Sequence, residues 1–229
     1  MGLAASARGI IKVLLKHGAD VNALSAAGVS PIHTIIETAD KDPSEPAERL
    51  HAITTGSAPG MLDIDALDKD GMTPLARLVS MRAVRTLRQR MLVMLVRNGA
   101  NIHAKQKCGA QNSLCSGGTP LHFACYNHDP VMLKFLIDKG ASEDVNSRTD
   151  AGFTPLMILV TAAAEGIIAR NELASMKNIL LDAGADPTVK NSEGKSAQDI
   201  WIEKNPSTGQ HWIWKSMLGA LDDSNYVRE

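Results

Sequence analysis

The sequence predicts an all-α solenoid, a stack of helix–turn–helix units, and three observations support this prediction. The chain has 229 residues, of which 44% are hydrophobic but only 3% aromatic, a composition that suits stacked short helices better than a β-sandwich. Apolar segments end at a recurring glycine, as in HGADVNA at 17–23 and NGANIHA at 98–104. A second glycine precedes a pair of residues that resembles Thr-Pro, at Gly28, Gly71, Gly117, Gly152 and Gly194.

The clearest unit begins at Gly117. Thr119 can cap a helix through its hydroxyl, and Pro120 suits the first helical position because the amide it lacks would have no partner there. Leu121, Ala124 and Cys125 then share one apolar face, which predicts a short first helix.

The second helix of this unit opens at Pro130, after a turn at 127–129. Its buried side is supplied by Val131, Leu133, Phe135, Leu136 and Ile137. Lys139 lies in its last turn, and Gly140 can adopt the left-handed conformation that ends a helix. A unit of this size cannot bury its own apolar face, so it requires neighbours of the same kind on both sides.

The segment 119–124, TPLHFA, resembles the T-P-L-H-x-A signature of the ankyrin-repeat family. With the two recurring glycine patterns, the resemblance extends over nearly the whole chain. It implies an L-shaped stack of helix pairs with β-hairpin-like fingers on one side, acting as a non-enzymatic protein–protein interaction module. The resemblance also implies that His33 and His122, at the fourth position of the signature, join backbone groups across repeats. Further residues of the signature are Thr73, Pro74, Thr119, Pro120, Thr154 and Pro155.

The recurring glycines divide the chain into units of unequal length. Ala76, Met157 and Gln198 are taken to replace the histidine in the other units, where we expect a looser stack. The predicted divisions are a partial repeat at 1–27, a degenerate repeat at 28–70, an elongated repeat with a long finger at 71–116, a regular repeat at 117–151, an elongated repeat at 152–193, a capping helix pair at 194–221 and a tail at 222–229.

Three of these units depart from the regular pattern. The unit that opens at Gly28 has no clear second helix, because 40–46 is predicted as a loop, 49–55 as one or two helical turns and 56–60 as a break. Two helix pairs carry five and nine extra residues, which predicts longer helices or turns. The finger between Ala100 and Gly117 is also longer than the others, so 105–116 is expected to project as a loop.

The chain start fits the second helix of a unit with no first helix ahead of it. Ile11, Leu14 or Leu15 should therefore lack neighbours. The start MGLAAS also fits a myristoylation pattern at Gly2, and residues 1–18 carry three basic residues and no acid, as a transit peptide does. Because the repeat pattern accounts for the same residues, the structural interpretation is favoured.

Charge is distributed unevenly along a chain whose net charge is -1. Residues 71–128 contain eight Lys and Arg and no Asp or Glu, whereas 37–70 contain nine acidic and three basic residues. The favoured interpretation is that neighbouring units pair these charges, each exposed pair contributing under about 1 kcal/mol. The alternative is that the basic cluster attracts an acidic or phosphorylated segment of a partner protein. Reversal of Arg82, Arg85 and Arg88 should then abolish capture without unfolding the chain.

The predicted function is an adaptor or scaffold that binds a partner protein through finger tips and the concave helical face. The alternative is a regulatory subunit that masks a transcription factor or an enzyme. Predicted partner contacts are Leu24, Ser25, Lys69, Asp70, Arg82, Arg85, Arg88, Lys105, Lys107, Arg148, Thr149, Asn191 and Glu193.

Other candidate sites receive structural interpretations. His103, Cys108 and Cys115 match no zinc spacing, and Cys125 is predicted as a core residue. Trp201, Trp212 and Trp214 are predicted to seal the end of the stack rather than to form a docking patch.

The sequence excludes several function classes. No nucleophile elbow, zinc-protease, Walker or dinucleotide motif occurs, so we expect neither enzyme activity nor a cofactor or metal. Nucleic acid is a weak option because no aromatic residue lies between Gly71 and Leu121 to stack on bases. An odd number of cysteines predicts an intracellular protein, in the cytoplasm or nucleus. The absence of an apolar run near 18 residues predicts that there is no transmembrane helix. We expect a monomer.

Overall fold

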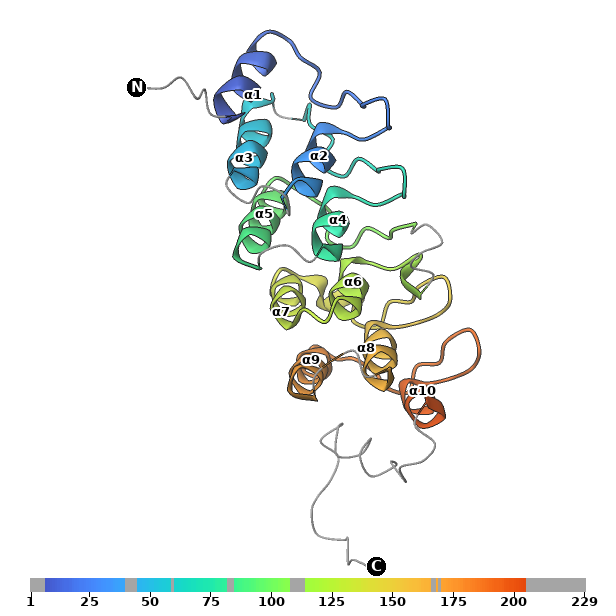
Figure 1. Cartoon of the computed structure of the whole chain (residues 1–229). Helices are drawn as coiled ribbons and strands as arrows, with labels where there is room; N and C mark the ends of the chain where they lie inside the picture. The colour runs from blue at the N-terminus through green and yellow to red at the C-terminus, as the bar shows by residue number, and fades with distance from the viewer. Residues whose placement is uncertain are drawn as a thin grey trace, which may run out of the picture.

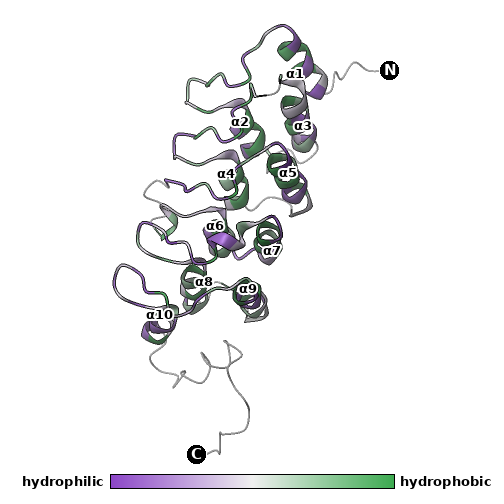
Figure 2. Ribbon diagram, turned by 180° about the vertical axis from the view of Figure 1, so that it is seen from behind, coloured by the Kyte–Doolittle hydropathy of each residue, from purple (hydrophilic) through white to green (hydrophobic). Residues whose placement is uncertain are grey.

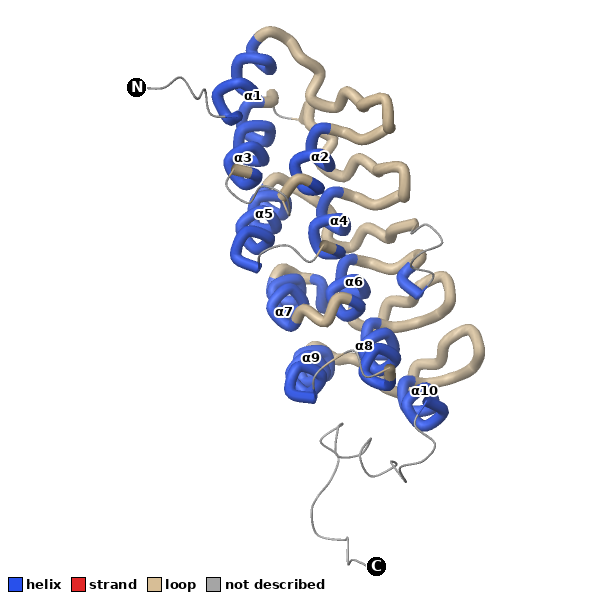
Figure 3. The backbone as a smooth tube through the Cα atoms, in the orientation of Figure 1, coloured by secondary structure: helices blue, strands red, loops and turns tan. Residues whose placement is uncertain are grey.

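The computed structural model describes residues 7–39, 45–58, 60–81, 85–107, 114–165, 168 and 170–204. In this part of the chain the helices form two rows that run side by side, and the loops between units project on one side as fingers (Figures 1 and 2). No strand occurs among the described residues, which contain one isolated antiparallel bridge between Gln106 and Gly118 (Figure 3). The predicted all-α solenoid is therefore confirmed.

The inner row lies on the finger side and the outer row behind it (Figure 1). The inner row comprises α2 (Pro31–Glu37), α4 (Pro74–Ser80), α6 (Pro120–Tyr126), α8 (Pro155–Ala164) and α10 (Ala197–Lys204). The outer row comprises α1 (Ala7–Lys16), α3 (Pro46–Gly56), α5 (Arg85–Arg97), α7 (Pro130–Asp138) and α9 (Arg170–Asp182), with the 3-10 helix η2 (Ala141–Asp144) after α7.

The inner helices start where the sequence places a capping residue and a proline. Thr73 and Thr154 have extended backbone, and their hydroxyls accept hydrogen bonds from Ala76 N and Met157 N, each at 3.3 Å. Proline at the first position costs no hydrogen bond there. Each inner helix therefore begins directly after the finger that precedes it.

The histidines of the signature connect consecutive units. His122 Nδ1 accepts a hydrogen bond from Thr119 N at 3.0 Å, and its Nε2 donates to the carbonyls of Ser147 and Phe153 at 3.1 and 3.2 Å. His33 repeats the arrangement, with its Nε2 3.1 Å from the carbonyl of Met72. Both rings thus fix the first turn of an inner helix to the finger that follows it.

In two of the three units without this histidine, other side chains take part of its role. Gln106 is fully buried and its Oε1 accepts from Thr73 N at 2.7 Å, where Ala76 offers no side-chain acceptor. In the last unit the ring is replaced by Asp199 and not by Gln198, because Asp199 Oδ2 accepts from Ser196 N at 2.8 Å. In these two units, residues from different places in the sequence therefore accept the hydrogen bond from the backbone N–H of the capping residue.

The core lies between the two rows. Its centre consists of fully buried aliphatic side chains, and each such burial stabilises the fold by about 1.5–3 kcal/mol. Inner-row members are Ile32, Leu75, Leu121 and Leu156, and outer-row members are Leu50, Leu92, Leu133 and Leu180.

One predicted irregularity is wrong. The unit that opens at Gly28 has a complete second helix, α3, which runs from Pro46 to Gly56 and packs against α1 and α5. Pro46 occupies its first turn, and Leu50 is fully buried, so the helix is held by packing although its sequence is weakly amphipathic.

The extra residues of the two elongated pairs lie at least partly in the helices. The regular pair has 7 residues in α6 and 9 in α7, whereas α5 has 13, α8 has 10 and α9 has 13. The longer outer helices extend the surface on the side away from the fingers.

At the far end, Trp201 of α10 is buried against the core, as expected of a residue that seals the stack. The predicted helix at 211–221, with Trp212 and Trp214, lies outside the described residues, as does Gly2. Among the described helices, none has the length and apolarity needed to cross a membrane.

Candidate partner-binding surface

In the described part of the chain, five fingers project from the stack: finger 1 (19–29), finger 2 (62–72), finger 3 (100–107 and 114–118), finger 4 (145–153) and finger 5 (185–195). Each passes through a glycine with positive φ just before the next inner helix. At Gly152, with φ of 78°, an added Cβ would lie 2.6 Å from Ser192 N, so both the conformation and the neighbouring finger require glycine there.

An equivalent residue closes the turn of four fingers through a side-chain acceptor. Ser25 Oγ, Asp68 Oδ1, Thr149 Oγ1 and Asn191 Oδ1 accept from the backbone N–H four residues later, at 2.9–3.2 Å. Thr149 and Asn191 are buried in this role. The prediction that Thr149 and Asn191 contact a partner is therefore wrong, because these side chains are directed into their own fingers.

A second equivalent residue hydrogen-bonds to the following finger. Asn22 donates to Met61 O at 2.6 Å and accepts from Asp63 N at 2.9 Å, and Asn146 does the same with Gly184 O and Asp186 N at 2.9 and 2.7 Å. Further contacts of this kind join Asp65 to Asn101 N at 3.0 Å and His103 Nδ1 to Asp144 at 2.8 Å. The fingers consequently form one continuous row.

Backbone hydrogen bonds join the fingers from the second onward. Lys107 N donates to Gly71 O at 3.2 Å, Asp150 N to Ser116 O at 2.7 Å and Ser192 N to Ala151 O at 3.2 Å. The expectation that all of 105–116 projects is wrong, since Gln106 and Cys115 are fully buried; residues 108–113, including Cys108, lie outside the described part. Finger 3 is therefore anchored at both ends.

A third equivalent position is exposed at every finger. It is occupied by Leu24 and Leu67 on fingers 1 and 2, which are 64% and 59% exposed, and by Lys105, Arg148 and Lys190 on fingers 3, 4 and 5. Lys190 was not among the predicted contacts, although alignment of the finger residues would have identified it. The side chains at this position form an exposed row that is apolar on fingers 1 and 2 and cationic on fingers 3, 4 and 5.

Other predicted finger contacts also lie on the surface. Ser25, Lys69, Lys107 and Glu193 are exposed, whereas Asp70 is half-buried and bound to Arg77 at 2.6 Å. Burial opposes ionisation of Asp68, but hydrogen bonds from Met72 N and the Arg77 guanidinium hold its pKa below the ordinary value. Arg77 therefore neutralises the acidic side of finger 2.

Part of the basic cluster of the central unit forms ion pairs. Arg77 binds Asp68 and Asp70, and Arg90 lies 3.5 Å from Glu48 of α3. Arg82 lies outside the described residues, and of Arg85 only the backbone is described, as the first residue of α5. Arg97, Lys105 and Lys107 form no ion pair within the described part of the chain, so neighbouring units pair only some of these charges.

The prediction that Arg88 lies on the partner-binding surface is wrong. It is 6% exposed, donates to the carbonyl of Met81 and forms a buried ion pair with Asp129. Asp129 also caps α7 by accepting from Met132 N at 3.1 Å. Removing one member of a buried pair costs about 3–5 kcal/mol, so reversal of Arg88 would destabilise the chain instead of leaving it folded.

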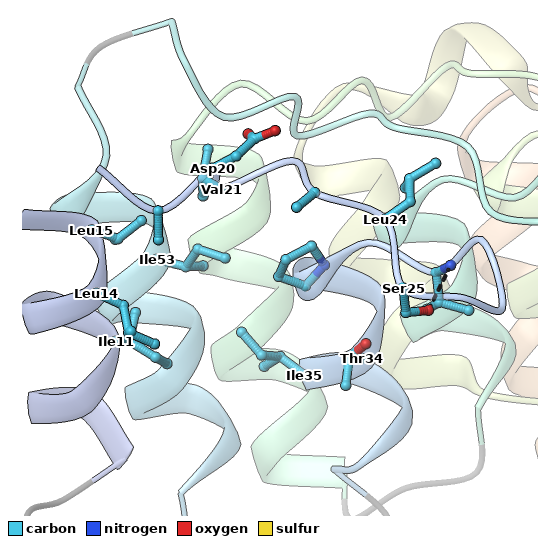
Figure 4. A pocket seen from close by; sticks show the side chains of 14 residues that line it. Ile11, Leu14, Leu15, Asp20, Val21, Leu24, Ser25, Thr34, Ile35 and Ile53 are labelled. Atoms are coloured by element: carbon cyan, nitrogen blue, oxygen red, sulfur yellow. Dashed lines mark hydrogen bonds between the residues drawn. The ribbon is translucent and has the colours of Figure 1, made fainter. Parts of the chain in front are cut away.

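An apolar groove of about 430 Å³ lies at the open end of the stack, beside α1. Figure 4 shows side chains of α1, α2, α3 and finger 1 facing this space, among them Leu14, Ile35, Ile53 and Leu24. Leu14 is 54% exposed, and Ile10 and Val13 of the same helix are similarly exposed. Of Ile11, Leu14 and Leu15, which are predicted to lack neighbours, Leu14 is exposed, whereas Ile11 and Leu15 are half-buried and pack against the core.

The cysteines and histidines of the described residues have structural surroundings. No group of three His, Cys, Asp or Glu among them could hold a metal ion. Cys115 and Cys125 are buried, and burial raises the pKa of the Cys125 thiol. Burial lowers the pKa of His122 to about 4 against the hydrogen bonds to Ser147 and Phe153, so the ring stays neutral at pH 7.

Comparisons with known proteins agree with this architecture. The family model "Ankyrin repeats (3 copies)" matches residues 80–191, and the model "Ankyrin repeat" matches residues 1–26. The chain is also similar to the crystal structure of the ankyrin repeat domain of Bcl-3, described as a unique member of the IkappaB protein family. The TM-score is 0.66 at 26% identity, over 84% of this chain and 72% of that one.

Two curated proteins are similar in sequence. The nuclear factor NF-kappa-B p105 subunit of Gallus gallus is 28% identical over 184 residues, which are 80% of this chain and 16% of that protein. Ankyrin repeat and SOCS box protein 9 of Homo sapiens is 34% identical over 89 residues, 39% of this chain and 26% of that protein. The chain thus spans a minor part of both relatives. Together, the repeat models and the solenoid show that the chain belongs to the ankyrin-repeat family, whose fold serves as a protein–protein interaction module.

Proposed function

We propose that this chain is an adaptor or scaffold that binds a partner protein along its finger row and the adjoining inner helices. The observation that supports this proposal is the exposed position shared by all five fingers, where Leu24, Leu67, Lys105, Arg148 and Lys190 lie on a rigid support. Because hydrogen bonds already order the backbone of the fingers, binding adds little further cost in backbone entropy.

The three cationic members of the row are not neutralised within the described part of the chain, where Lys105, Arg148 and Lys190 form no ion pair. The charged groups of two of them contact backbone carbonyls: Lys105 Nζ lies 3.5 Å from Arg148 O, and the Arg148 guanidinium donates to Lys190 O. These charges therefore remain available to an acidic partner.

A regulatory role is the second candidate. It is favoured by the similarity to the NF-kappa-B p105 subunit and to Bcl-3 of the IkappaB family. Such a role predicts a stoichiometric complex that changes the activity of the bound protein, whereas an adaptor leaves that activity unchanged.

The test is affinity capture from a lysate of cells that express the protein, followed by mass spectrometry, with the wild type and a triple variant Lys105→Glu, Arg148→Glu and Lys190→Glu. We expect one stoichiometric protein that is lost in the triple variant and at high salt. A catch that both conditions leave unchanged would contradict a role for the fingers. Circular dichroism of both proteins controls for folding.

A further inference from the structure

The exposed row of the fingers is chemically polarised along the solenoid. Its first two members are leucines and its last three are cations, in the order Leu24, Leu67, Lys105, Arg148, Lys190. All five occupy equivalent places in successive fingers. Along the row the position therefore stays the same, while the side chain offered to a partner changes from apolar to cationic.

The apolar half of the row continues into the groove beside α1. Leu24 is both a member of the row and a lining residue of the groove, together with Leu14 and Ile11 of α1 (Figure 4). Leu67 on finger 2 is exposed next to it in the row. Bulky apolar side chains of a bound segment would lose contact with water here.

The described residues of fingers 3 to 5 carry more cations than acids: Lys105, Lys107, Arg148, Lys190 and Lys195 against Asp150, Asp186 and Glu193. Asp150 on finger 4 is held by the Ser116 hydroxyl at 2.7 Å, and Glu193 on finger 5 pairs with Lys195 at 3.0 Å. Exposed Lys107 adds to the positive charge at finger 3. This half therefore favours carboxylates.

The spacing of the units suits an extended chain. Packed helices lie about 8–10 Å apart, and successive fingers follow the inner row at the same interval. An extended peptide advances about 3.3 Å per residue, so about every third residue of a bound segment would reach the next finger.

We propose that the finger row binds an extended segment of a partner protein in which bulky apolar residues, over Leu24, Leu67 and the groove, are followed by acidic residues at about every third position, over Lys105, Arg148 and Lys190. This inference rests on the proposed interaction function and specifies the partner. The order of chemistries identifies such a segment, since a uniformly acidic chain would leave the two leucines and the groove unpaired.

The test uses fluorescent synthetic peptides of about 15 residues and the full chain. One peptide carries two leucines and then three glutamates at every third position, with Ser and Gly between; a second has the reverse order, and a third has a shuffled sequence of the same composition. We expect one of the ordered peptides to bind at least about tenfold more tightly than the shuffled one.

Four sets of variants locate the binding. The triple variant Lys105→Glu, Arg148→Glu and Lys190→Glu should bind the preferred peptide about tenfold or more weakly. The control Lys16→Glu, Arg97→Glu and Lys139→Glu makes the same charge change at exposed cations where outer helices end, and should bind within about twofold of the wild type. Leu24→Ser with Leu67→Ser should also weaken binding, whereas Ile202→Ser on α10 should not.

The polarised row is overturned if the shuffled peptide binds equally well, if no peptide binds, or if a single-stranded DNA of equal charge competes as effectively as the ordered peptide. Failure of the peptides together with a captured protein that the triple charge variant loses would reject the apolar-to-acidic order and keep the interaction function. A captured protein that no finger variant affects would reject both.

Discussion

The centre of the solenoid and its first unit are built from the same repeat but are held together differently. Between α5 and α8 the units share a buried ion pair, a histidine with two carbonyl partners and backbone bonds between fingers. At the first unit, the Asn22 side chain joins fingers 1 and 2, and α1 exposes Ile10, Val13 and Leu14. Stability is thus concentrated in the centre, while accessible apolar surface is concentrated at the start.

The largest expected effect is on the central ion pair. Arg88→Met should lower the free energy of unfolding by about 3–5 kcal/mol, because it leaves Asp129 charged and buried without its partner. Urea denaturation measures the loss. Arg88→Met with Asp129→Asn should recover much of it, since Asn still caps α7; equal stability of the single variant and the wild type would contradict the contrast between the two regions.

The pH dependence of the centre should depend on His122. Its pKa in the folded chain is lowered to about 4, below the unfolded value of 6.5, so the stability it provides is complete above pH 6.5 and is lost as pH falls toward 4. The shift corresponds to at most about 3 kcal/mol over this range.

Denaturation curves of the wild type and His122→Gln between pH 7 and pH 5 test this effect. The variant cannot titrate and should show a smaller decline, although His33, whose pKa is also lowered by burial, should preserve part of it. Identical slopes in the two proteins would show that His122 does not control the decline.

The smallest effect on stability is expected at the first unit. Leu14→Ser and Val13→Ser should each change the free energy of unfolding by under about 0.5 kcal/mol, because both side chains are already more than half exposed. Leu50→Ala in α3 is the matched core variant and should cost about 2–5 kcal/mol. A large loss from Leu14→Ser would mean that α1 is packed more tightly than its exposure indicates.

Much of the fold was predictable because its signals are local. Thr73, Pro74 and their equivalents set the starts of the inner helices within a few residues of sequence. Helix α3 was underestimated because glycine and proline flank a weakly amphipathic segment, yet Pro46 marked its start.

The candidate surface was less predictable because it depends on contacts between units. Arg88 and Asp129 are 41 residues apart, and no local pattern shows that they meet. Thr149 and Asn191 are predicted partner contacts because they lie in fingers, but their side chains close the finger turns. Alignment of the fingers places both at the position of Asp68 and places Lys190 in the exposed row.

Several side-chain hydrogen bonds between units run in one direction. Asn22, His33, Asp65, His122 and Asn146 each find backbone partners in the unit that follows. Removal of a unit therefore leaves side chains of the unit before it without partners, while the unit after it loses the partners of its backbone N–H and C=O groups. Unfolding that starts from the last unit should leave unsatisfied side chains at each new edge, whereas unfolding from the first should leave unsatisfied backbone groups there.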